Sequence, residues 1–212
     1  MSNLARSLAR PAAAVAVLTI ALAACTTTSL VNMWRDPSAP RQPLTNVLVV
    51  TLQRNATNRR LWEDRFVREL HSHGVNATAS YNEFPGAPPD TGALGTAVRG
   101  RGYDAVLLAH QLPSGNETRY VPGYLSTQPV TYLSPWTGHY YTYFTEVYSP
   151  GYVQTDRVVR YETEVWMTRG PGRLIWSGAT ESINPASAEQ VNKEIADIIV
   201  PAIVKSGVIQ AQ

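Results

Sequence analysis

The chain has 212 residues, of which 44% are hydrophobic and 16% charged, a composition that suits one globular domain. Its formal net charge of +2 comes from Arg6 and Arg10 near the N-terminus, so the rest of the chain is close to neutral. Because a nucleic-acid-binding protein needs a basic face, this balance argues against nucleic acid as a partner. The single cysteine excludes an intramolecular disulfide.

The N-terminus has the pattern of an export signal. Arg6 and Arg10 precede an apolar run, residues 12–22, which has the length of a signal-peptide core and is too short to span a bilayer. Leu22-Ala23-Ala24-Cys25 follows and resembles the lipobox of bacterial lipoproteins. The resemblance implies that residues 1–24 are a signal peptide, that Cys25 is acylated, and that its acyl chains anchor the protein in a membrane. The alternative, a plain signal cleaved after Ala24, would leave Cys25 as a free thiol.

The residue after the cysteine, Thr26, bears on localisation. In well-studied lipoproteins an Asp at this position favours retention in the inner membrane. By resemblance, Thr26 therefore implies the outer membrane, with the protein facing the periplasm, in preference to the inner membrane.

Residues 25–45 are expected to be the lipidated cysteine and a tether, because Pro37, Pro40 and Pro43 disfavour both helix and central strand. Trp34 interrupts this segment. We weigh two interpretations of it, a hydrophobic plug against the folded domain and an aromatic residue that binds a partner.

A single α/β domain is predicted over residues 46–207. Residues 46–52 form an apolar run that is typical of a buried strand, and residues 55–73 have helical periodicity, with Trp62, Phe66, Val67 and Leu70 on one face. The opposite face carries i,i+4 charge pairs, Arg59–Glu63 among them. A strand over 75–81, a helix over 90–99 and a strand over 104–110 complete a βαβαβ pattern, which predicts a largely parallel core.

The second half of the chain changes character. Residues 153–167 and 173–178 are expected to be antiparallel strands joined by a turn. A C-terminal helix begins near Asn184-Pro185, and residues 208–212 are expected to fray. The helix presents one apolar face, made of Val191, Ile195, Ile198 and Ala202. The fold class is therefore α/β of the mixed α+β kind, a two- or three-layer sandwich whose βαβαβ core is extended by an antiparallel aromatic hairpin and this helix.

The hairpin belongs to a Tyr-rich insertion at about residues 115–152. Nine of the eleven tyrosines lie between residues 118 and 161. Residues 122–137 are expected to be an irregular loop and 139–148 a strand, with a turn at 149–151 leading into the next strand. Two interpretations are open. Tyrosines are common strand residues on ordinary sheet faces, and they are also enriched in surfaces that bind partners. On the second interpretation, the best candidates for partner binding are Tyr124, Tyr132 and Trp136.

Few residues suggest catalytic chemistry. Arg54 and His110 follow predicted core strands, where α/β folds gather ligands, so they mark a candidate ligand pocket. His71 and His73 end the first helix and lack the acidic or thiol neighbours of a zinc site. No phosphate-binding loop, nucleophile elbow or metalloprotease motif occurs in the sequence. We therefore expect no metal, no cofactor and no enzymatic activity.

Five segments together resemble a family of small bacterial envelope lipoproteins, and they cover most of the chain after the signal. They are the lipobox at Cys25, Trp34-Arg35-Asp36-Pro37, residues 47–51, residues 62–66 and residues 172–178. A more distant likeness, of element order only, is to periplasmic lipoprotein domains that activate penicillin-binding proteins and to the N-terminal domain of the Tol translocation protein. Those domains mediate interactions and are not enzymes, but the aromatic insertion departs from their plan, so their partners do not carry over. The anchor, the balanced charge, the missing catalytic motifs and the aromatic segment predict a non-catalytic interaction module whose partner is an envelope protein or a cell-wall component. The alternative is a lipoprotein that binds a small ligand or a cell-wall glycan.

Overall fold

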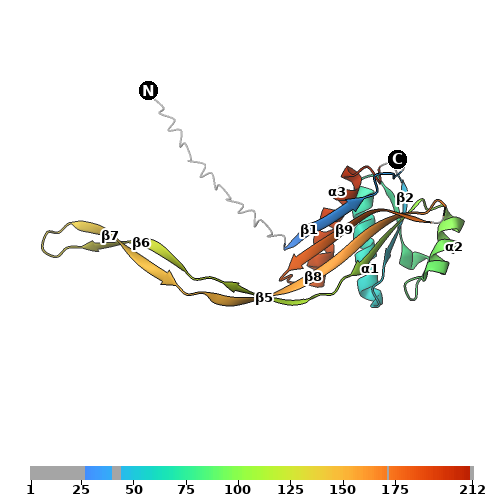
Figure 1. Ribbon diagram of the computed structural model, residues 1–212. Helices are drawn as coiled ribbons and strands as arrows, with labels where there is room; N and C mark the ends of the chain where they lie inside the picture. Colours follow the sequence, from blue (N-terminus) through green and yellow to red (C-terminus); the bar gives the residue numbers. More distant parts are fainter. Residues whose placement is uncertain (1–26, 40–43, 171, 211–212) are drawn as a thin grey trace, which may run out of the picture.

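The computed structural model describes residues 27–39, 44–170 and 172–210, which form an α/β domain and a long two-stranded arm that projects from one end of its sheet (Figure 1). The signal peptide, Cys25 and the last two residues lie outside the described residues. In chain order the elements are β1 (Thr28–Arg35), β2 (Asn46–Thr51), α1 (Ala56–Ser72), β3 (Asn76–Ala79), the 3-10 helix η1 (Ser80–Asn82), α2 (Thr91–Arg101), β4 (Ala105–Gln111), β5 (Gly115–Val121), β6 (Tyr124–Leu133), β7 (Tyr140–Ser149), β8 (Tyr152–Met167), β9 (Arg173–Ile183) and α3 (Ala188–Lys205).

The main sheet is mixed, and it confirms the predicted α/β class. Its strand order is β1-β9-β8-β4-β2-β3, and β5 pairs with β8 beyond β4. The pairings of β2 with β3 and β4 are parallel, as the βαβαβ pattern predicts, whereas β4, β8, β9 and β1 pair antiparallel. None of the helices within the described ranges combines the length and the hydropathy of a membrane-spanning segment.

Alternating side chains of the central strands supply two cores. Val47 and Val49 face the larger core, which they share with α1 and α3, while Leu48 and Val50 face a smaller core under α2. The domain therefore has three layers over β2 and β4. The apolar stripe predicted for α1 is confirmed, since Trp62, Phe66 and Leu70 are all buried.

The predicted tether is wrong for residues 28–35, which form β1 at the edge of the sheet. Thr28 pairs with Ser182 and Arg35 with Trp176 of β9. The prolines lie beyond this strand, so they do not prevent it. Trp34 is not a buried plug, because its side chain on this edge strand remains 45% exposed.

The C-terminal segment differs from the prediction at two places. Along α3 the buried face runs through Val191, Ile195, Ile199 and Ile203, whereas Ile198 and Ala202 are only half-buried. The predicted fraying is wrong at Val208 and Ile209, which are buried in the larger core. Ile209 forms a parallel bridge with Leu44, and this bridge holds the end of the chain against the domain.

Candidate functional site

The most distinctive feature of the structure is the arm, which comprises β5, β6, β7 and the first part of β8. β5 pairs with β8 from Gly115–Val158 to Val121–Tyr152, and β6 pairs with β7 from Tyr124–Ser149 to Leu133–Tyr140. Both ladders are antiparallel and have the same register. At about 3.3 Å per residue, the ribbon from Gly115 to Leu133 is roughly 60 Å long. Figure 1 shows that its distal part lies far from the domain.

The predicted loop at residues 122–137 is therefore wrong, because most of it is strand β6. The chain reverses at residues 134–139, where the Ser134 amide donates to the His139 carbonyl at 2.9 Å. The predicted turn at 149–151 is instead an interruption within the returning strand. Pro129 suggested an irregular segment. However, backbone N–H groups along a strand point alternately toward and away from the paired strand, and the Ser134 N–H points toward β7. The Pro129 nitrogen, five residues earlier, therefore points away from β7, and this proline removes no hydrogen bond from the ladder.

The interruption halfway along the arm has a local cause. Pro122 and Gly123 lie opposite Pro150 and Gly151. The alternation that turns the Pro129 nitrogen outward turns the Pro122 nitrogen toward the opposite strand, where proline has no N–H to give to the ladder. The two glycines let the strands approach closely: a Cβ at Gly123 would lie 2.7 Å from the Ser149 carbonyl oxygen and 2.8 Å from the Gly151 nitrogen. We call residues 124–149, beyond this crossing, the distal arm.

The base of the arm is polar and firmly attached. Asp156 accepts hydrogen bonds from the side chains of Gln154, at 2.8 Å, and Asn184, at 2.7 Å, which hold the pKa of its carboxyl below the usual value. Asn184, in a left-handed conformation with φ of 50°, also accepts a bond from the Arg157 amide. Arg160 binds Glu117 and Glu181, and these two carboxylates raise the pKa of the guanidinium.

The distal arm is different, because it is aromatic and almost uncharged. Between Tyr120 and Thr155 the only charged residue is Glu146. Large apolar side chains on both faces are exposed, and Trp136 at the tip is 94% exposed. An isolated two-stranded hairpin is marginally stable in water, and exposed apolar patches of this kind mark interaction sites.

Three of the predicted partner-binding residues lie on this arm. Tyr124 begins β6, Tyr132 lies near its end and Trp136 is at the tip. The fourth, Trp34, lies on β1 in the domain, so the structure does not bring all four together. The sequence prediction missed Leu125, Leu133, Tyr140, Phe144 and Tyr148, although the absence of charge from this segment is a signal that would have found them.

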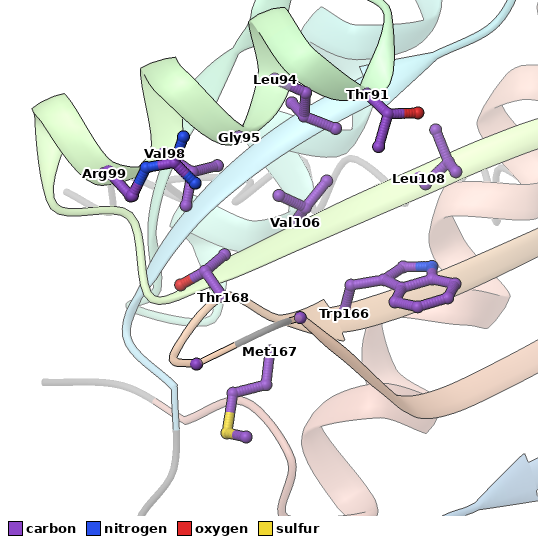
Figure 2. A pocket seen from close by; sticks show the side chains of 12 residues that line it. Thr91, Leu94, Gly95, Val98, Arg99, Val106, Leu108, Trp166, Met167 and Thr168 are labelled. Atoms are coloured by element: carbon purple, nitrogen blue, oxygen red, sulfur yellow. The ribbon is translucent and has the colours of Figure 1, made fainter.

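The predicted pocket residues do not line the described cavities. His110 lies at the carboxyl end of β4, with its Nε2 3.5 Å from Glu162 Oε2, and Arg54 lies exposed after β2. A cavity of about 500 Å³ lies instead between α2 and the sheet (Figure 2). Its lining is mainly apolar and includes Leu94, Val98, Val106, Leu108 and Trp166. Among the described residues, no group of three His, Cys, Asp or Glu side chains is placed to hold a metal ion.

No protein-family model and no curated protein matches the sequence. Solved structures with a similar course of the chain include two PelC dodecamers from Paraburkholderia phytofirmans. One has a TM-score of 0.45 at 13% identity, over 85% of this chain and 99% of that chain. The other has a TM-score of 0.44 at 14% identity, over 87% and 99%. A PDZ domain protein from Parabacteroides distasonis matches at 0.33 and 8% identity, over 75% of this chain and 32% of that one.

Proposed function

We propose that this protein is a non-catalytic, lipid-anchored envelope protein that acts as an interaction module, and that the distal arm is its contact surface. The observation that supports the proposal is the arm itself. The ribbon exposes aromatic side chains on both faces and has one charged residue between Tyr120 and Thr155. This is the composition of a surface that is buried in an interface with a partner. The lipobox at Cys25 would place the module on the outer membrane, facing the periplasm, where an envelope protein or a cell-wall component is available.

The arm suits this role because its base is hydrogen-bonded to the main sheet, whereas the side chains of its distal part are exposed to solvent. Asp156, Asn184 and Arg160 hold the first part of the ribbon to the sheet, as their hydrogen bonds show. Tyrosine and tryptophan bring large, rigid contact areas with few rotatable bonds, so they lose little entropy when they are covered.

The test is capture of crosslinked complexes from intact cells. Deleting residues 124–149 joins Gly123 to Pro150, which lie opposite each other across the ribbon, and leaves β5 and β8 paired. We expect the full chain to retain envelope components that the deletion variant loses. Equal capture by both chains would contradict the assignment of the arm, and incorporation of no acyl chain into Cys25 would contradict the anchor.

A second candidate function is the binding of a small ligand or glycan fragment, which the cavity beside α2 favours. Its volume of about 500 Å³ lies in the range of small-molecule sites. A ligand bound there would raise the melting temperature of the protein with concentration. We expect Val98→Trp to fill the cavity and abolish that shift, whereas deletion of the distal arm would leave it unchanged.

A further inference from the structure

The two faces of the distal arm carry different side chains. Successive residues of a strand point to opposite faces, and directly paired residues share a face. One face, which we call the leucine face, carries six large or apolar residues: Leu125, Pro129, Leu133, Tyr140, Phe144 and Tyr148. The same face carries Glu146, the one charged residue of the distal arm. The opposite face, the tyrosine face, also carries six: Tyr124, Val130, Tyr132, Tyr141, Tyr143 and Val147. The leucine face therefore holds both leucines and the only phenylalanine of the arm.

The leucine face is the more exposed of the two, because aromatic rings on the tyrosine face partly cover one another. The Tyr132 ring lies 5.9 Å from Tyr141 and 6.1 Å from Tyr143, measured between centroids. On the leucine face, Phe144 is 71% exposed and Tyr140 is 74% exposed. The leucine face therefore has the larger apolar area to remove from water, provided that the Glu146 carboxylate stays at the level of the headgroups, where it remains hydrated.

The length of chain outside the structure suggests what covers this face. β1 begins at the end of the sheet from which the arm projects, since Thr28 pairs with Ser182, and the next residue, Ile183, pairs with Val158 at the root of the arm (Figure 1). Cys25 is only three residues before Thr28, so it lies within about 11 Å of that end. Three strand spacings, about 15 Å, separate β1 from β5 across the sheet. An acyl chain on Cys25 would therefore hold a bilayer close to the root of the arm.

The chemistry of the arm also fits a lipid surface. Tyr and Trp favour the boundary between headgroups and hydrocarbon, where one part of the side chain is apolar and another is hydrated. With no Lys or Arg between Tyr120 and Thr155, the arm has no means of attracting anionic headgroups and would bind by apolar contact. At the boundary, water still reaches the unpaired backbone edges of β6 and β7, which would be costly to bury in hydrocarbon.

We infer that the leucine face of the distal arm lies on the lipid surface of the bilayer in which Cys25 is anchored. This inference rests on the proposed function, because it takes the anchor at Cys25 as given, and it names the bilayer as the partner of the arm. The tyrosine face then points to the water side, where it stays available.

The experiment uses the full, lipidated chain in phosphatidylcholine vesicles, with an environment-sensitive fluorophore on an introduced cysteine. Acylation consumes the thiol of Cys25, so only the introduced thiol reacts. Three labelled variants are compared: Phe144→Cys on the leucine face, Gln128→Cys on the tyrosine face and Thr96→Cys on the exposed side of α2. Lipids brominated along their acyl chains report contact by quenching the fluorophore.

We expect the label at residue 144 to shift to the blue and to be quenched most by bromines near the headgroups, because an interfacial segment enters about 5–10 Å. The labels at residues 128 and 96 are expected to be quenched weakly and about equally. A label at residue 144 that is quenched no more than the one at residue 96 would overturn the inference. A blue shift that follows protein concentration without lipid quenching would also overturn it, and would point to a second copy of the chain on this face. Labelling of the unsubstituted chain would instead reveal a free Cys25 and contradict the proposed anchor.

Discussion

At the scale of single residues, Arg59 and Glu63 on α1 form an ion pair that is buried instead of exposed. Their spacing predicts an ion pair on the solvent-facing side of the helix, but both side chains are buried. Arg59 donates to the carbonyls of Phe84 and Gly86 and to Ser80 Oγ, while Glu63 accepts from the Tyr81 amide at 2.9 Å. The segment after β3 folds over this pair, and its groups satisfy both charges.

We expect Arg59→Met to lower the free energy of unfolding by about 3–5 kcal/mol, because it leaves Glu63 buried without its partner. Urea unfolding followed by circular dichroism measures the change. Arg68→Ala on the exposed side of the same helix is the control, and it should change the stability by less than about 0.5 kcal/mol. Equal effects of the two substitutions would contradict the structural role of the pair.

The sequence predicted the existence of this pair but not its burial, and the reason is physical. Spacing along a helix shows which residues are neighbours, whereas burial depends on segments that arrive later in the chain. Ser80, Phe84 and Gly86 lie 21 to 27 residues after Arg59. The stripe of Trp62, Phe66 and Leu70 was predictable, because helical periodicity alone defines it.

At the scale of elements, the crossing at Gly123 and Gly151 decides whether the arm forms one ribbon. The backbones approach so closely there that a side chain on Gly123 would contact backbone atoms of the opposite strand. The sequence showed two Pro-Gly pairs and predicted loops, but it did not show that the pairs lie opposite each other. That placement depends on the shared register of the two ladders.

We expect Gly123→Ala to open the arm, because backbone atoms of the opposite strand must move to admit the methyl group. Strain of about 1–2 kcal/mol would raise the opened fraction roughly 5- to 30-fold. Chymotrypsin, which cleaves after aromatic residues, should then cut the arm faster than in the wild type. Gly115→Ala is the matched control, because a Cβ there has no atom within 4 Å. Equal cleavage of the two variants would count against a close crossing.

The base of the arm should be sensitive to acid. Hydrogen bonds from Gln154 and Asn184 hold the pKa of Asp156 below its unfolded value, so its contribution to stability is present above about pH 4 and is lost as the pH falls through the folded pKa. We expect Asp156→Asn to lower the melting temperature at pH 6 and to have a smaller effect at pH 3. A difference that is the same at both values would contradict this role of the carboxylate.

At the scale of the whole molecule, the domain and the arm differ in whether their apolar side chains are buried. The domain buries apolar side chains on both faces of a mixed sheet, whereas the arm exposes apolar side chains on both faces of two strands. The sequence predicted the mixed class and an aromatic insertion at residues 115–152. It could not predict that the insertion projects from the sheet, because tyrosines alternate in the same way on a packed sheet and on a free ribbon.

Because the domain has its own cores, it should not depend on the distal arm. We expect deletion of residues 124–149 to change the free energy of unfolding by less than about 1 kcal/mol, which corresponds to a melting-temperature shift of roughly 2–4 °C or less. Differential scanning calorimetry measures the shift. Loss of the cooperative transition would mean that the arm is part of the folded domain.

Site-specific photocrosslinking in intact cells can show whether the distal arm or the domain is the contact surface. A benzophenone amino acid is placed at Phe144 on the arm or at Thr96 on α2, both of which are exposed. We expect crosslinked products, with lipid or with an envelope component, from position 144 and few from position 96. Products from position 96 with none from position 144 would show that the domain, and not the arm, is the contact surface.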